Sequence, residues 1–336
     1  MKFFIADAFT TELFGGNPAG VVIIDPDSPA LGADGYPDAE VMRKTAAELR
    51  YSETAFIRPL GNIDPAKAAA AETPIAGEFQ VRYFTPADEV DLCGHATIAS
   101  FSCLREAGYV EPGNTYMYHT LAGDLYVQIK EDSVMMDMAT PEFIGDITDV
   151  DAMKELYTIM GLDYDANIPE LERQCAANGG DGSGLKPEMI STGLPDIMMP
   201  VASREQLAAI KPDFEALTEL SRKYEVVGVH AFTLDGGVHR GGSANGGSDE
   251  VTAYCRNFAP LYDIDEEAAT GTSNGALTYY LIRNEIECGP DRLFIQGEAM
   301  DRPSAICSHV ETAPDGTIKI QVGGSAIILA EGNINI

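Results

Sequence analysis

Short apolar runs and alternating segments dominate this chain and predict a strand-rich fold. Residues 79–84 alternate between apolar and polar side chains and stop at Thr85-Pro86, as expected for a strand that ends before proline. Helical spacing behind an acidic first turn predicts a helix over 38–49. A capping box at Ser203 to Gln206 predicts another helix. Further strands are expected at 2–9, 21–24, 51–57, 125–130, 133–138, 226–234, 252–258, 318–322 and 326–329.

Two more predicted helices, at about 94–107 and 272–283, are apolar or small on nearly every side. A helix without a polar face belongs inside a core. Their openings resemble each other, Cys93-Gly94-His95 in one and Thr270-Gly271-Thr272 in the other, about half a chain apart. The pattern predicts two similar domains, each a central helix wrapped by strands. Chance similarity of two short turns would also explain the resemblance of the two helix openings.

The length of 336 residues supports the same division, because single cores stop growing at roughly 250–300 residues. We place the first domain at 1–118, joined by the last strand at about 328–336, and the second at 119–327. Gly-rich stretches at 176–184 and 241–248 are expected to be loops.

Charge limits the partners. The chain has 22 basic and 53 acidic residues, a formal net charge of −31. Such an excess of acid argues against nucleic acid and against an anionic membrane surface, since both are bound by clustered Lys and Arg. An anionic substrate would have to be held locally, by dipoles and hydrogen bonds.

Six scattered cysteines show no metal-type spacing and no disulfide framework, so we expect reduced thiols and no metal site. An acid at Asp7 interrupts the first apolar run too early for a signal peptide, and no run is long enough to span a membrane. We expect a cytoplasmic protein.

Two clusters in the first half could carry chemistry. Glu53 stands between apolar residues, which suits a carboxyl group that takes and returns a proton, although a solvent-facing strand position is equally compatible. In Cys93-Gly94-His95, a helix start offers free N–H groups and favours a thiolate, while the imidazole can relay a proton. A buried cysteine and a capping histidine are the plain alternatives.

A third cluster repeats this arrangement at Glu267, Gly271 and Thr272, with acids before a glycine-containing helix start. An acidic segment stabilised by the helix dipole is the ordinary alternative. Taken together, two helix N-termini and two carboxylates suggest an anion-binding cleft with acid/base groups.

Many short motifs, in order along nearly the whole chain, resemble the PhzF family of phenazine biosynthesis-like isomerases. They are Asp7-Ala8-Phe9, Phe14-Gly15-Gly16-Asn17-Pro18-Ala19-Gly20, Ser52-Glu53-Thr54-Ala55-Phe56, Tyr83-Phe84-Thr85-Pro86, Asp91-Leu92-Cys93-Gly94-His95-Ala96-Thr97, Arg256-Asn257-Phe258-Ala259-Pro260, Ala269-Thr270-Gly271, Gln296-Gly297, Arg302-Pro303-Ser304 and Gly323-Gly324-Ser325-Ala326. The resemblance implies an α+β, diaminopimelate-epimerase-like fold of two pseudo-symmetric domains with an interdomain active-site cleft. It also implies a homodimer, a small anionic carboxylic acid as substrate and no cofactor.

The resemblance assigns roles to individual residues. Glu53 matches the acid/base glutamate of the family, His95 matches the histidine of the first helix turn, and Glu267 stands where the family commonly has an aspartate. These three form the expected catalytic set. The expected substrate-binding positions are Asn17, Ser52, Cys93, Gly94, Gly271 and Thr272.

The chain departs from the family pattern in the second half. Asp-Pro-(Ala/Val)-Thr-Gly-Ser becomes Glu267-Ala268-Ala269-Thr270-Gly271-Thr272, and Gly-Arg-Pro-Ser becomes Asp301-Arg302-Pro303-Ser304. The longer acid, the lost proline and the extra methyl of Thr272 bear on substrate choice.

Three hypotheses remain open from the sequence. The leading one is a cofactor-independent isomerase in which Glu53 shuttles a proton. The second is a racemase or epimerase of a small amino or hydroxy acid that uses Cys93. Against it, the chain has no second thiol at the corresponding position of the other helix start, which holds Thr270. The third is a catalytically silent binding protein that keeps the cleft.

Overall fold

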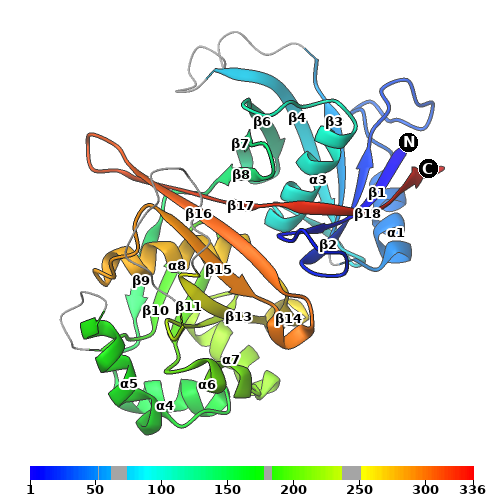
Figure 1. Ribbon diagram of the computed structural model, residues 1–336. Coiled ribbons are helices and arrows are strands. Elements are labelled where there is room, and N and C mark those ends of the chain that lie inside the picture. The colour runs from blue at the N-terminus through cyan, green and yellow to red at the C-terminus, as the bar shows by residue number, and fades with distance from the viewer. Residues whose placement is uncertain (52, 62–73, 178–183, 237–250) are drawn as a thin grey trace. The chain divides into compact units, whose positions relative to one another are not determined.

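The structure is a computed structural model and describes residues 1–51, 53–61, 74–177, 184–236 and 251–336 (Figure 1). The chain forms two compact units, the first made of Met1–Asp137 with Gly323–Ile336 and the second of Met138–Val322. The division lies after Asp137, later than the expected boundary at 118, and the return to the first unit begins at Gly323 rather than near 328. The reason is hydrogen bonding: strands that follow residue 118 continue the sheet of the first unit.

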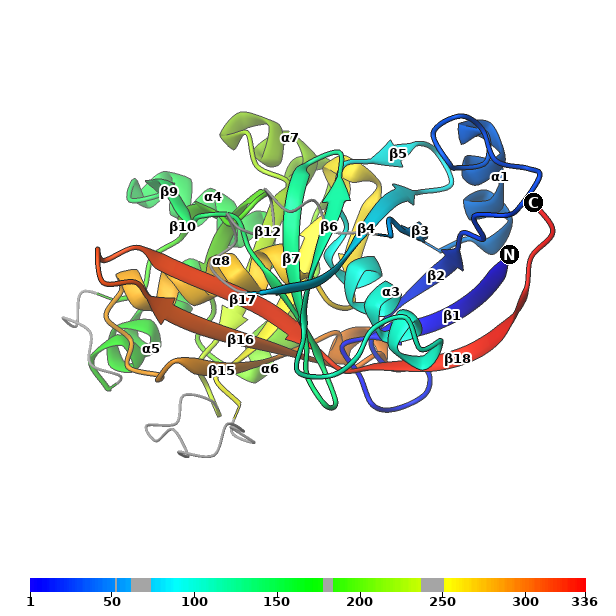
Figure 2. The same ribbon diagram turned by 90° about the horizontal axis from the view of Figure 1, so that it is seen from above.

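The sheet of the first unit begins with three neighbouring strands, in which β1 pairs antiparallel with both β2 and β18 (Figure 2). It continues through the parallel pair β2–β3, the antiparallel pair β3–β4 and the parallel pair β4–β6, and ends with the antiparallel strands β7 and β8. The short β5 pairs with β4. The bounds are β1 Lys2–Ala8, β2 Asn17–Ile23, β3 Thr54–Pro59, β4 Ile75–Phe84, β5 Glu89–Val90, β6 Thr115–Thr120, β7 Gly123–Ile129, β8 Val134–Asp137 and β18 Ala326–Asn333.

This sheet encloses one helix, α3 (Gly94–Glu106), while α1 (Ala39–Leu49) packs outside it (Figure 1). Every residue of α3 from His95 to Leu104 is buried, which confirms the prediction from its apolar surface. The helix contacts β1, β2, β3, β8 and β18, strands from both ends of the sheet. Because protein packs around the helix from His95 to Leu104, its first turn is held in place.

The second unit also encloses a helix, α8 (Gly271–Arg283), which contacts β10, β11 and β16. Its strands pair in the order β9, β10, β11, β12, β13, β15, β16, with β14 added on β13; β11–β12 and β13–β15 are parallel. The bounds are β9 Glu142–Asp146, β10 Glu188–Ser191, β11 Pro195–Pro200, β12 Gly228–Thr233, β13 Ala253–Ala259, β14 Ile264–Glu267, β15 Asp291–Gln296, β16 Ser304–Thr312 and β17 Ile318–Gly324, with short 3-10 helices η1 Pro260–Tyr262 and η2 Glu298–Met300.

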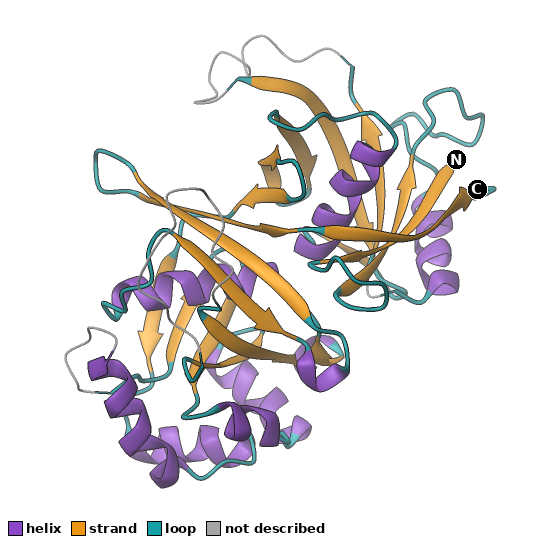
Figure 3. Ribbon diagram, viewed as in Figure 1, coloured by secondary structure: helices purple, strands orange, loops and turns teal. Residues whose placement is uncertain are grey.

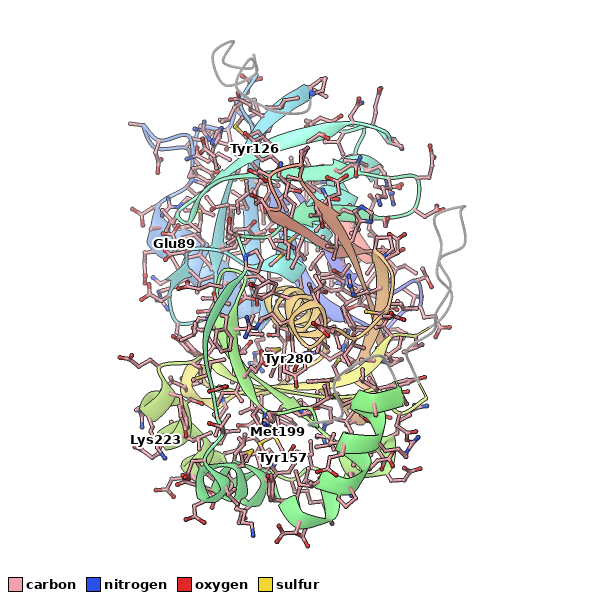
Figure 4. All side chains as sticks on the ribbon, turned by 90° about the vertical axis from the view of Figure 1, so that its left-hand side faces the viewer. Glu89, Tyr126, Tyr157, Met199, Lys223 and Tyr280 are labelled. Atoms are coloured by element: carbon pink, nitrogen blue, oxygen red, sulfur yellow. The ribbon has the colours of Figure 1, made fainter. Side chains whose placement is uncertain are left out.

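Alternation along β11 and β12 gives these strands two buried faces. Ile197 and Met199 point into an apolar cluster that includes Tyr157. Figure 4 labels Met199 and Tyr157. That cluster lies under four helices, purple in Figure 3: α4 Val150–Ile159, α5 Tyr164–Ala177, α6 Arg204–Ala209 and α7 Phe214–Tyr224. On the other face, Phe232 packs edge-on against Tyr280 of α8, with ring centroids 5.1 Å apart. The four helices make the second unit larger than the first.

Several predicted elements agree closely with the structure. The helix expected at 38–49 is α1, capped by Asp38, and the capping box at Ser203 opens α6. The helices α4 and α5 and the strands β9 to β11 had no counterpart in the sequence analysis. The loop expected at 241–248 lies outside the described residues, as does most of the one at 176–184. Among the described residues, no helix is both long and apolar enough to cross a membrane.

One glycine fixes how closely β3 approaches β2. A Cβ atom on Gly20 would stand 2.9 Å from Thr54 Oγ1 and 3.2 Å from Leu49 Cδ1. The Gly20 amide also donates to the carbonyl oxygen of Glu53 at 3.2 Å. Gly20 therefore sets the position of Glu53 at the start of β3.

Replacing this glycine should destabilise the protein. We expect Gly20→Val to lower the free energy of unfolding by about 2 kcal/mol or more, because Thr54 is short, fully buried and has no room to retreat. The matched control is Gly332→Val in β18, where a Cβ meets nothing within 4 Å and the change should stay within about 0.5 kcal/mol. Urea unfolding measures both; equal effects would contradict this account.

Candidate active site

The first unit brings Glu53, Cys93 and His95 together at the N-terminus of α3. Glu53 directly precedes β3, Cys93 is the N-cap of α3, and His95 is the second residue of that helix. Two parallel strands and the buried helix therefore join residues that are 40 positions apart in the sequence. Two of the three expected catalytic residues, Glu53 and His95, are therefore neighbours in the structure.

The three side chains contact one another directly. His95 Nε2 lies 3.1 Å from Glu53 Oε2, and Cys93 Sγ donates to the same oxygen at 3.2 Å. Cys93 Sγ lies 3.4 Å from His95 Nδ1. The imidazole is 3% exposed and the Glu53 side chain 13% exposed, so the carboxylate is largely shielded from water yet still reachable.

The helix N-terminus adds donors to this cluster. Cys93 Sγ accepts from the Ala96 amide at 3.4 Å, as an N-cap side chain does. Among the described residues, the amide of Gly94 has no hydrogen-bond acceptor. A free N–H at a helix N-terminus attracts negative charge.

Two further expected residues of the first unit are Asn17 and Ser52, and the structure describes only the first of them. Asn17 is buried at the start of β2, three residues before the glycine that holds Glu53. Ser52 lies outside the described residues.

The second unit repeats the arrangement with different side chains. Thr270 is the N-cap of α8, and its hydroxyl donates to Glu267 Oε2 at 2.6 Å, much as the Cys93 thiol donates to Glu53. Gln296 holds the turn: its Nε2 donates to the Glu267 carbonyl at 2.7 Å, and its Oε1 accepts from the Thr270 amide at 3.3 Å. These bonds brace the segment where the family commonly has a proline.

The first turn of α8 also presents unpaired donors. Gly271, Thr272 and Ser273 are all buried, and no acceptor for their amides is found in the described part of the chain. Buried N–H groups are rarely left without a partner in native proteins. This turn therefore has the chemistry of an anion-binding site.

Beneath that turn lies a polar network that the sequence analysis missed. The Ser273 hydroxyl donates to the Asp196 carboxylate, Asn257 Nδ2 donates to Ser273 Oγ at 3.1 Å, and the same amide lies 3.2 Å from His230 Nδ1. Burial is the main cause that raises the pKa of Asp196 to about 7 and lowers the pKa of His230 to about 3. The one sequence signal for it was an acid inside the apolar run at 195–200.

Comparison with solved structures defines the class of fold. The chain superposes on a hydroxyproline epimerase from Agrobacterium vitis with a TM-score of 0.54, covering 99% of this chain and 91% of that one at 13% identity. It superposes on a PhzF-family phenazine biosynthesis protein from Bacillus anthracis with a TM-score of 0.75, covering 100% and 99% at 24% identity. These likenesses confirm the expected α+β, diaminopimelate-epimerase-like fold.

Sequence comparison then identifies the family. Residues 6–332 match the family PhzC-PhzF, described as phenazine biosynthesis-like protein. An uncharacterized isomerase of Deinococcus radiodurans is 32% identical over an alignment of 336 positions, which covers 97% of this chain and 92% of the relative. The chain therefore belongs to the PhzF family, and the expectation that it is an isomerase is confirmed.

The buried network makes a prediction about stability and pH. The folded state keeps a proton on Asp196 that the unfolded chain releases above about pH 4, so this group's contribution to the free energy of unfolding falls as pH rises toward 7. In the variant Asp196→Asn the side chain resembles the neutral acid but does not titrate, so the fall in the free energy of unfolding with pH is removed. The free energy of unfolding of D196N, minus that of the wild type, should increase by up to about 1.4 kcal/mol per pH unit between pH 4 and 7 and then level off.

Urea unfolding from pH 4 to 9 measures this difference. Asp265→Asn, at an exposed position of the same unit, is the control and should show little dependence. A difference between D196N and the wild type that does not change with pH would contradict the assignment.

Proposed function

We propose that this protein moves a proton on the carbon skeleton of a small carboxylic acid, without a cofactor, and that Glu53 takes and returns the proton. The observation that carries the proposal is the contact of a largely buried carboxylate with His95 Nε2 at 3.1 Å and Cys93 Sγ at 3.2 Å. A general base needs to be close to the substrate, shielded from bulk water and held in one orientation.

Each partner of Glu53 has a separate task in this proposal. His95 and Cys93 both contact Oε2, so together they hold the carboxyl group in one orientation. The imidazole can also give a proton to a neighbouring atom of the substrate when Glu53 has taken one. The Gly94 amide would donate to the oxygen on which negative charge develops as the C–H bond breaks.

The N-terminus of α8 has the matching task of binding an anion. Its first three residues are buried, and their amides, which have no acceptor among the described residues, supply N–H groups at the positive end of a helix dipole. We propose that this turn binds an anionic group and that Glu267, which Thr270 orients, has an acid/base role. Local donors of this kind can hold an anion in spite of a net charge of −31.

The first test concerns Glu53. A panel of small carboxylic acids is incubated with the protein in D₂O, and deuterium uptake at carbon is followed by NMR. Glu53→Gln should lower the rate for any active acid by about 100-fold or more, because a general base is removed. Glu48→Gln, at an exposed position of α1, should leave the rate unchanged.

Cys93→Ala separates this mechanism from the alternatives. We expect it to keep exchange within about tenfold of the wild type, since Glu53 and His95 remain. If Cys93→Ala abolishes exchange and Glu53→Gln does not, the protein is a thiol-dependent racemase or epimerase. If acids raise the melting temperature but none takes up deuterium in the wild type, it is a silent binding protein.

The second test concerns Glu267. Glu267→Gln keeps an oxygen that can accept from Thr270 but removes the acid/base group. We expect at least about a tenfold loss of the exchange rate at saturating substrate, with little change in the substrate concentration at half saturation. Asp265→Asn serves as the control, and equal rates in both variants would limit Glu267 to a structural role.

A further inference from the structure

Glu53, Cys93 and His95 together form the donor set of a zinc site. In the described part of the chain, they are the one group of three potential ligands whose donor atoms all lie within 4.8 Å of one another. We propose that this cluster binds one Zn²⁺ ion through Glu53 Oε2, Cys93 Sγ and His95 Nε2, and that bound zinc inhibits the protein. The binding stands by itself, whereas the inhibition rests on the function proposed above.

The distances within the cluster already approach those of a zinc centre. Tetrahedral zinc separates a sulfur from a nitrogen or oxygen ligand by about 3.5 Å, and a nitrogen from an oxygen by about 3.3 Å. In the structure, Sγ lies 3.8 Å from Nε2 and 3.2 Å from Oε2, and Nε2 lies 3.1 Å from Oε2. Shifts of a few tenths of an ångström would complete the geometry.

The backbone holds these ligands ready. Cys93 and His95 belong to the first turn of a helix that is buried from His95 to Leu104. Glu53 is anchored through its carbonyl oxygen, which accepts from the Gly20 amide at 3.2 Å. A site whose ligands are ordered before the metal arrives loses little conformational entropy on binding.

The chemistry of the donors selects the metal. A thiolate, an imidazole and a carboxylate suit Zn²⁺, whereas Mg²⁺ and Ca²⁺ prefer oxygen ligands only. When the thiol proton leaves to solvent, the thiolate and the carboxylate balance the two positive charges of the ion. Burial is then much less costly than for an isolated charge. Three protein ligands leave the fourth position for water.

Such an ion would block proton transfer directly. It would occupy the lone pairs of Glu53 and His95, which the proposed reaction needs for the incoming proton. The protein's charge of −31 raises the local concentration of cations and so favours the encounter.

The test uses Co²⁺ as a spectroscopic probe and Zn²⁺ as its competitor. Co²⁺ bound to a thiolate gives a charge-transfer band in the near ultraviolet that binding through oxygen or nitrogen alone does not give. We expect one equivalent of Co²⁺ to produce this band, one equivalent of Zn²⁺ to remove it, and Cys93→Ala to abolish it. His95→Ala should weaken Co²⁺ binding by at least about tenfold, because one of three ligands is lost.

Cys307→Ala is the matched control, since Cys307 is half-buried whereas the other cysteines of the described chain are buried. It should leave the band unchanged. The proposal is overturned if the wild type shows no band, or if the band survives in Cys93→Ala. Circular dichroism of each variant confirms that it is folded.

Deuterium exchange then separates the two proposals. If an acid is exchanged, Zn²⁺ should inhibit the wild type, EDTA should restore the rate, and Cys93→Ala should resist inhibition by at least about tenfold. Exchange without Co²⁺ binding refutes the zinc site and leaves the proposed function intact. Metal binding without exchange of any acid supports the site and refutes the proposed function.

Discussion

A helix enclosed by its own sheet can give few of its first amides to water, and this constraint applies to both halves of the protein. Those N–H groups need acceptors from the protein or from a ligand. In α3 the Cys93 sulfur takes one amide, while in α8 three buried amides find no acceptor among the described residues. The small residues at both helix starts, Gly94 and Gly271, follow from the same need, because a ligand must come close to the backbone.

The two helix starts share a plan and differ in chemistry. In each, the N-cap side chain donates to a carboxylate, Cys93 to Glu53 and Thr270 to Glu267. The first half carries a thiol and an imidazole at its helix start, whereas the second carries hydroxyls. Departures from the family pattern fall in the second half, and one of them, Asp301, adopts a left-handed φ of 53° that glycine would adopt more easily.

The sequence predicted what depends on local pattern and missed what depends on distant contacts. The buried helices at Gly94 and Gly271 were visible because an apolar surface has only one physical explanation. The role of Glu53 came from family resemblance, since nothing local shows that it meets His95. Asp196 and His230 come from separate strands and meet α8 only in the fold, so no spacing reveals them. The expected homodimer and cytoplasmic location stay predictions.

The pairing of β1 with β18 has a consequence for how the protein is made. The ammonium group of Met1 donates to the Ile334 carbonyl at 2.9 Å, across 333 positions of sequence, and Lys2 lies opposite Asn333. On a ribosome, the strand that flanks α3 emerges long after Glu53, Cys93 and His95 have been translated. The second unit, contiguous from Met138 to Val322, can acquire its core first. The first unit is therefore completed last, and a nascent chain stalled before β18 would lack the strand that pairs with β1 and contacts α3.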